Sequence, residues 1–181
     1  MKNGNIGAHG KFRLWCNEPH EDSCLLAPTD DSVFLHQFKE GKTYHTCTLV
    51  LECIIPRGAR VVYGLLGVRY LPSNVDAVLR VKAGKSPLSK KIYSDSLIGI
   101  FEATNIGLPP EYAAASISGL KRAFEDGANL SSGMVEICHA AYGDVSSNEP
   151  TFEKIAFTLA HLLSLECTDI SAERVHSLLT K

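Results

Sequence analysis

Long apolar runs are missing from this sequence. No window approaches the roughly 18 consecutive apolar residues that a membrane-spanning helix needs. The first five residues, MKNGN, do not open the apolar stretch of a signal peptide. We therefore expect a soluble, cytoplasmic protein that makes no membrane contact.

A strong charge of either sign is also missing. The chain has 18 Lys and Arg residues against 20 Asp and Glu residues, a net charge of -2. It lacks the positive excess that is typical of nucleic-acid-binding domains, so any contact with RNA is expected to be local. With 181 residues, 45% of them hydrophobic, the composition is that of one ordinary globular domain without repeats.

Cysteine is thinly spread, and a chain of this size builds a sufficient core without disulfides. We therefore predict free thiols at the six positions Cys16, Cys24, Cys47, Cys53, Cys138 and Cys167. Cys16, His20 and Cys24 are the candidates for a metal site, because each is separated from the next by three residues. Three further residues are candidates for the fourth ligand of a tetrahedral zinc ion: His36, His45 and Cys47. Paired ligands lie closer together in zinc fingers and ribbons, so free thiols are the preferred interpretation and no metal or cofactor is predicted.

Residues 1–42 show no sustained periodicity and are rich in Gly, Asn, Asp and Pro. We interpret them as an irregular N-terminal arm packed on a domain formed by residues 43–181. Trp15 and Phe34 are large apolar residues of this arm. If they cover the sheet of a neighbouring copy, the protein is a homo-oligomer.

Strands are predicted wherever apolar residues alternate or run together. Residues 44–55 and 60–68 flank a Pro-Arg-Gly turn and predict a β-hairpin. Residues 76–82 and 92–103 are expected to continue the sheet. A further strand is predicted over 134–142.

Three segments have helical spacing. The first runs from the prolines at 109 and 110 to Asp126, the second covers 149–164, and a short one follows an N-cap at Ser171. Gly119 is expected to let the first helix approach the sheet closely. The order strands, helix, strand, helix predicts an α+β fold, a two-layer sandwich with helices on one face of the sheet.

Two blocks of the sequence resemble domain IV of elongation factor G. Residues 106–112 (IGLPPEY), with SGL at 118–120 and EDG at 125–127, are similar to the entry into the first helix of that domain. Residues 135–137 (VEI) and 143–147 (GDVSS) are similar to its later strand and its acidic-serine loop. The resemblance implies the ribosomal protein S5 domain 2-like fold, here standing alone without a GTPase domain. It also implies contact with RNA, the ribosome or a protein partner.

The chain departs from that family at two places. Its loop at Tyr142-Gly143-Asp144 is shorter than the family's tip loop and lacks the histidine found there. The segment AGKS at 83–86 has Leu79 where a phosphate-binding P-loop requires its first glycine. Nucleotide binding at this segment is therefore not expected.

A basic run without acidic residues extends from 77 to 93, next to Tyr93. Its cations are Arg80, Lys82, Lys85, Lys90 and Lys91. They suit contact with an RNA backbone, but lysines also protect exposed strand edges from unwanted pairing. The second interpretation is preferred because the whole chain is acidic.

Two further sites are weaker candidates. Tyr142 and Asp144 lie in the loop that is expected to contact a partner, although helix capping also explains the serines beside them. Cys138 and His139 are consecutive on a strand, so they are expected to point to opposite faces and to form no catalytic pair. We therefore expect a binding module rather than an enzyme. A small enzyme of the same fold is the alternative.

Overall fold

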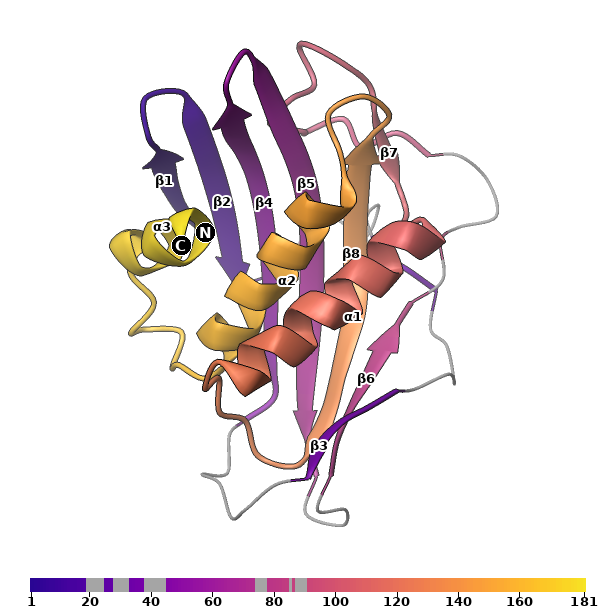
Figure 1. Cartoon of the computed structure of the whole chain (residues 1–181), viewed down its shortest axis with the longest axis vertical. Coiled ribbons are helices and arrows are strands. Elements are labelled where there is room, and N and C mark those ends of the chain that lie inside the picture. Colours follow the sequence, from indigo (N-terminus) through magenta and orange to yellow (C-terminus); the bar gives the residue numbers. More distant parts are fainter. Residues whose placement is uncertain (19–24, 28–32, 38–44, 74–77, 85, 87–90) are drawn as a thin grey trace.

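The computed structural model describes residues 1–18, 25–27, 33–37, 45–73, 78–84, 86 and 91–181. Within these ranges it contains eight strands and three helices (Figure 1). The strands are β1 (Lys2–Ile6), β2 (Gly10–Cys16), β3 (Val33–Gln37), β4 (Cys47–Arg57), β5 (Arg60–Pro72), β6 (Val78–Ala83), β7 (Thr104–Ile106) and β8 (Gly133–Gly143). The helices are α1 (Pro110–Glu125), α2 (Glu149–Leu163) and α3 (Ala172–Thr180).

All eight strands belong to one mixed sheet. Seven follow the order β1-β2-β4-β5-β8-β6-β3. The eighth, β7, pairs with the C-terminal end of β8, where Thr104 lies opposite Gly143. Strands β6 and β8 are parallel, whereas the other pairs are antiparallel. The predicted hairpin is confirmed as β4 and β5, which pair from Cys47 opposite Tyr70 to Arg57 opposite Arg60.

Residues 2–16 form regular strands, which corrects the prediction of an irregular arm for this part of residues 1–42. Strands β1 and β2 form a hairpin, and β2 pairs with β4, so the sheet continues across the proposed boundary at residue 42. Phe12 and Leu14 alternate with Lys11 and Arg13, and the two apolar side chains are buried. This alternation covers too few residues to be recognised as a strand. The hydrogen bonds to β4 stabilise it in the fold.

Residues 92–103 were expected to form a strand, but they form turns. The amides of Gly99 and Phe101 donate to the carbonyls of Ser96 and Ile98, which closes the chain on itself. The Leu97 amide donates to the buried carboxylate of Glu52 at 2.8 Å. Strand pairing within residues 92–103 is limited to an isolated bridge between Ile92 and Asn105 of β7. The next residues, Thr104–Ile106, form β7 and join the sheet.

Helices α1, α2 and α3 cover one face of the sheet, as Figure 1 shows. The main core lies between them and the strands, and it includes Leu51, Leu66, Leu120 and Phe152. A smaller core on the opposite face joins Trp15 to Tyr63 and to side chains of the 92–103 segment. Trp15 is therefore buried within its own chain. It is not available to cover the sheet of a neighbouring copy, as the homo-oligomer hypothesis required.

Gly119 was expected to pack against the sheet, but a Cβ atom at this position would collide with the backbone carbonyl of Glu153. The glycine therefore allows α1 to approach α2.

Helices α1 and α2 occupy the predicted ranges within one or two residues, so the α+β class with helices on one face is confirmed. In the part of the chain that the structure describes, no helix combines the length and apolarity needed to cross a bilayer.

Candidate anion-binding pocket

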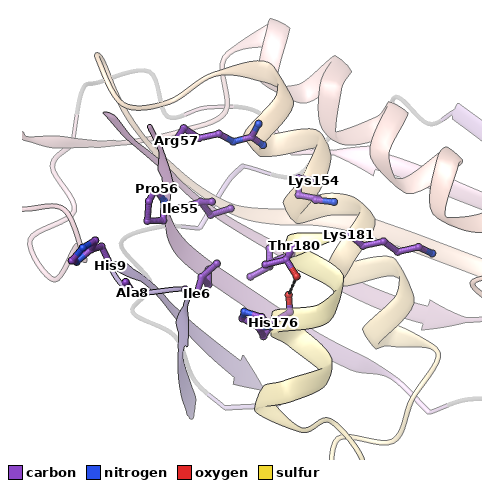
Figure 2. A pocket seen from close by; sticks show the side chains of 12 residues that line it. Ile6, Ala8, His9, Ile55, Pro56, Arg57, Lys154, His176, Thr180 and Lys181 are labelled. Atoms are coloured by element: carbon purple, nitrogen blue, oxygen red, sulfur yellow. Dashed lines mark hydrogen bonds between the residues drawn. The ribbon is translucent and has the colours of Figure 1, made fainter. Parts of the chain in front are cut away.

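A pocket of about 610 Å³ opens beside the end of the sheet where β1 turns into β2 (Figure 2). Four elements supply its walls: the β1–β2 turn, the end of β4, helix α2 and the last turns of α3. The lining residues are Ile6, Gly7, Ala8, His9, Ile55, Pro56, Arg57, Lys154, His176, Leu179, Thr180 and Lys181. Its volume lies within the range typical of small-molecule sites, about 300–1,000 Å³.

The charge of this pocket has one sign. Its twelve lining residues include five basic side chains and no acidic one. The basic side chains are His9, Arg57, Lys154, His176 and Lys181. Arg57, Lys154 and Lys181 carry positive charge at neutral pH. Like charges repel one another in a partly enclosed site, so this arrangement favours an anion among them.

Lys154 carries the clearest electrostatic signature. This residue of α2 is half-buried, and its ammonium lies 5.8 Å from the centre of the Phe157 ring. Burial lowers the pKa of Lys154, and the nearby cations Arg122, Arg57 and Lys181 lower it further, whereas the Glu153 carboxylate raises it. An anion would relieve both effects because it replaces lost hydration and opposes the positive charges.

The five basic residues do not contribute equally. The Lys181 ammonium already lies 3.0 Å from an Asp126 carboxylate oxygen, which offsets its charge. Arg57 and Lys154, by contrast, have no ion-pair partner within the described residues. They are therefore the cations most available to a ligand.

The floor of the pocket is apolar. Ile6 and Leu179 are both 3% exposed and belong to the main core, and Ile55 lies beside them. A site with cations at its rim and aliphatic side chains beneath suits a molecule with an anionic group and an apolar part. No sequence motif indicated this pocket, because its residues come from four distant segments that only the fold brings together.

The sequence-predicted binding residues lie elsewhere and do not form one site. Arg80 and Lys82 are on β6, on the sheet face opposite the helices, and are in register with Met134 and Glu136 of β8. Tyr142 is six residues beyond Glu136, which is roughly 20 Å along a strand. Lys91 is exposed beside β7. Lys85 and Lys90 of the predicted run lie outside the described residues, as do the candidate metal ligands His20 and Cys24.

Tyr142 and Asp144 make contacts within the fold. The Tyr142 ring meets the ring of Tyr112 edge-on at 5.9 Å, and Asp144 accepts a hydrogen bond from the Asn105 amide at 3.0 Å. The cap of α2 is Asn148 rather than one of the preceding serines, since its side chain accepts from the Thr151 amide at 3.0 Å. These contacts order the loop between β8 and α2.

Cys138 and His139 were predicted to point to opposite faces, and this is wrong. The register between β5 and β8 shifts between Gly67 and Val68, which pair with His139 and Ile137. Cys138 is the extra residue of this β-bulge, so the usual alternation is lost. Its Sγ atom lies 3.2 Å from Nδ1 of His139. Burial raises the pKa of Cys138 to about 12, so its thiol stays protonated at neutral pH and is a poor nucleophile.

No protein-family model matches this chain, and no curated protein sequence is significantly similar to it. The likeness to domain IV of elongation factor G therefore stays a prediction from the sequence.

Proposed function

We propose that this chain is a binding module that holds a small phosphorylated molecule in the basic pocket. The observation that carries the proposal is the lining itself: five basic side chains, no acidic one, and an apolar floor. Arg57 and Lys154 are assigned to the phosphate because they have no ion-pair partner among the described residues. Ile6, Ile55 and Leu179 would contact the apolar part of the ligand.

Binding rather than catalysis is proposed because of the state of the thiol in the Cys138–His139 pair. That thiol is buried and protonated, and it lies on β8, which contributes no residue to the pocket. The pocket itself supplies cations and aliphatic side chains, which suit the recognition of an anion.

The test is calorimetric titration of the whole chain with inorganic pyrophosphate and with AMP, at low and at raised salt. Hydrogen bonds to charged groups contribute about 1.5–3 kcal/mol each. Replacing Arg57 or Lys154 by Gln is therefore expected to weaken AMP binding by about 10-fold or more. Lys121→Gln is the matched control, since Lys121 is an exposed helical lysine on α1, away from the pocket. Binding that is unchanged in the Arg57→Gln, Lys154→Gln double variant would refute the assignment, and so would no binding of either probe.

RNA is the second candidate ligand, because its phosphates could use the same cations and the sequence resembles a domain that contacts the ribosome. A single-stranded RNA oligonucleotide is titrated in the same way. If Arg57→Gln and Lys154→Gln weaken its binding, RNA reaches the pocket. If Arg80→Gln, Lys82→Gln and Lys91→Gln weaken it instead, the basic run is the RNA contact and the pocket is not.

A further inference from the structure

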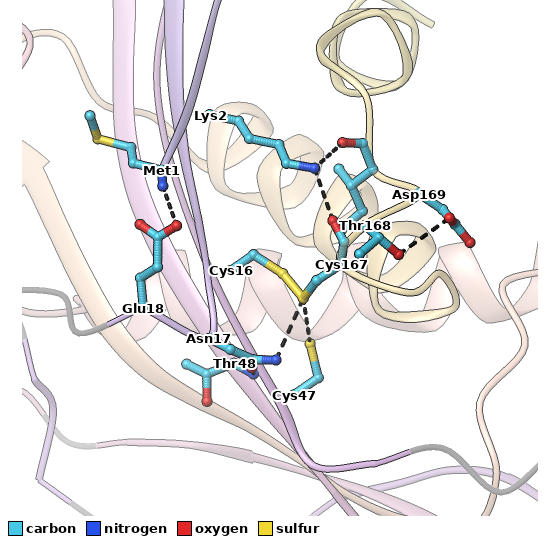
Figure 3. The surroundings of a disulfide bond; sticks show 11 residues. Met1, Lys2, Cys16, Asn17, Glu18, Cys47, Thr48, Cys167, Thr168 and Asp169 are labelled. Atoms are coloured by element: carbon cyan, nitrogen blue, oxygen red, sulfur yellow. Dashed lines mark hydrogen bonds and ion pairs between the residues drawn. A yellow bond between two sulfur atoms is a disulfide. The ribbon is translucent and has the colours of Figure 1, made fainter.

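Three cysteines from distant parts of the chain meet at the end of the sheet opposite the pocket (Figure 3). Cys16 ends β2, Cys47 begins β4, and Cys167 lies in the connection between α2 and α3. Cys16 and Cys167 form a disulfide with their Cα atoms 6.1 Å apart, which corrects the prediction of free thiols at these two positions. Cys47 keeps a free thiol beside it, as do Cys53 and Cys138 elsewhere.

The Cys47 thiol is close enough to share a ligand with the other two sulfur atoms. Its Sγ lies 3.9 Å from Sγ of Cys167, and all three Sγ atoms are within 4.8 Å of one another. Zinc binds thiolate sulfur at about 2.3 Å with tetrahedral geometry, which puts two ligand sulfurs about 3.8 Å apart. The separation of Cys47 and Cys167 therefore fits two ligands of one ion.

Cys47 is only half-buried, and its free thiol lies within reach of the other two sulfur atoms. A divalent ion that binds these cysteines replaces their thiol protons, because the thiolate is the form of cysteine that binds a metal. The Asn17 amide donates to Sγ of Cys167 at 3.5 Å, and the Lys2 ammonium donates to its carbonyl at 2.9 Å. Both groups oppose the negative charge of a thiolate cluster.

We propose that the reduced protein binds one zinc ion through Cys16, Cys47 and Cys167. A dithiol or phosphine reductant first supplies two electrons to the Cys16–Cys167 disulfide, which takes up two protons and becomes two thiols, while the reductant is oxidised. Zinc then displaces three thiol protons and binds three thiolates. Three protein ligands leave the fourth tetrahedral position to water or another small ligand. The site is thus a disulfide when oxidised and a metal centre when reduced, and it is independent of the proposed pocket.

The test is titration of the whole chain, reduced with a phosphine, with Zn²⁺ in competition with a chromogenic chelator. One equivalent is expected to bind the reduced protein and none the oxidised protein. Co²⁺ in place of Zn²⁺ is expected to give the absorption of thiolate-to-cobalt charge transfer. Cys47→Ser is expected to lower zinc affinity by about 100-fold or more, since the hydroxyl does not replace a thiolate ligand. This variant keeps the disulfide, so circular dichroism before reduction establishes that it is folded.

Cys138→Ser and Cys53→Ser are the matched controls, because both remove a free cysteine that lies outside the cluster. Both are expected to bind zinc as the unaltered chain does. Zinc binding that is lost in Cys24→Ser and retained in Cys47→Ser would place the metal elsewhere and overturn the proposal. So would failure of the reduced, folded chain to bind zinc, or peptide mapping that finds Cys47 joined to Cys167 in place of Cys16.

Discussion

Glu52 gives the sharpest test of this structure, because a carboxylate is fully buried at its position on β4. One carboxylate oxygen accepts hydrogen bonds from the Tyr63 hydroxyl at 3.1 Å and the Leu97 amide at 2.8 Å. The other lies 3.6 Å from the Arg13 guanidinium and accepts no hydrogen bond from the described residues. Burial raises the pKa of Glu52 from 4.5 to about 7, although these partners and Arg13 each lower it.

The direction of the pH effect follows from this raised pKa. The folded protein holds the Glu52 proton up to about pH 7, whereas the unfolded chain releases it near pH 4.5. The stability that this group contributes is therefore fully present below pH 4.5 and is lost as the pH rises towards 7. Each pKa unit corresponds to about 1.4 kcal/mol, so Glu52 alone makes the unfolding free energy fall by about 3 kcal/mol across this window.

The measurement is urea denaturation between pH 4.5 and pH 8 for the unaltered chain and for Glu52→Gln. The glutamine does not titrate, so the difference between the two unfolding free energies is expected to change by about 3 kcal/mol in favour of the variant as the pH rises. The change with pH is the test, since the absolute level also reflects how the new amide fits beside Arg13. Glu125→Gln, at an exposed carboxyl of α1, is the control and should run parallel to the unaltered chain. Parallel curves for Glu52→Gln would refute a buried carboxyl with a raised pKa.

Two further changes test how the helices are placed. Gly119→Ala is expected to lower the unfolding free energy by about 1–3 kcal/mol, because the new methyl group meets the carbonyl of Glu153. The measurement is thermal denaturation. An unchanged midpoint would argue against this contact between α1 and α2. Asn148→Ala is expected to lower the unfolding free energy measured by urea denaturation by about 0.5–2 kcal/mol, since it removes the acceptor for the Thr151 amide. A smaller decrease would mean that water or another group caps α2 equally well.

Local patterns predicted much of the fold. The hairpin of β4 and β5 follows from alternation on both sides of a turn, and α1 and α2 follow from helical spacing between prolines at the start and a break at the end. Such elements are specified by residues a few positions apart, so a sequence states them directly. The β-bulge at Cys138 was missed because it depends on the register with β5, and that register is fixed by a strand about 70 residues away in the chain.

The candidate sites depend even more on distant contacts. The sequence by itself determined the α+β class and the helices, through periodicity and turn residues. Only the tertiary structure decided that Arg57 and Lys154 share one pocket, that Cys47 lies beside Cys167, and that Glu52 is buried. The reason is that charge, ligand geometry and burial are properties of neighbours in space. Those neighbours are set by which strands pair and which helix covers them.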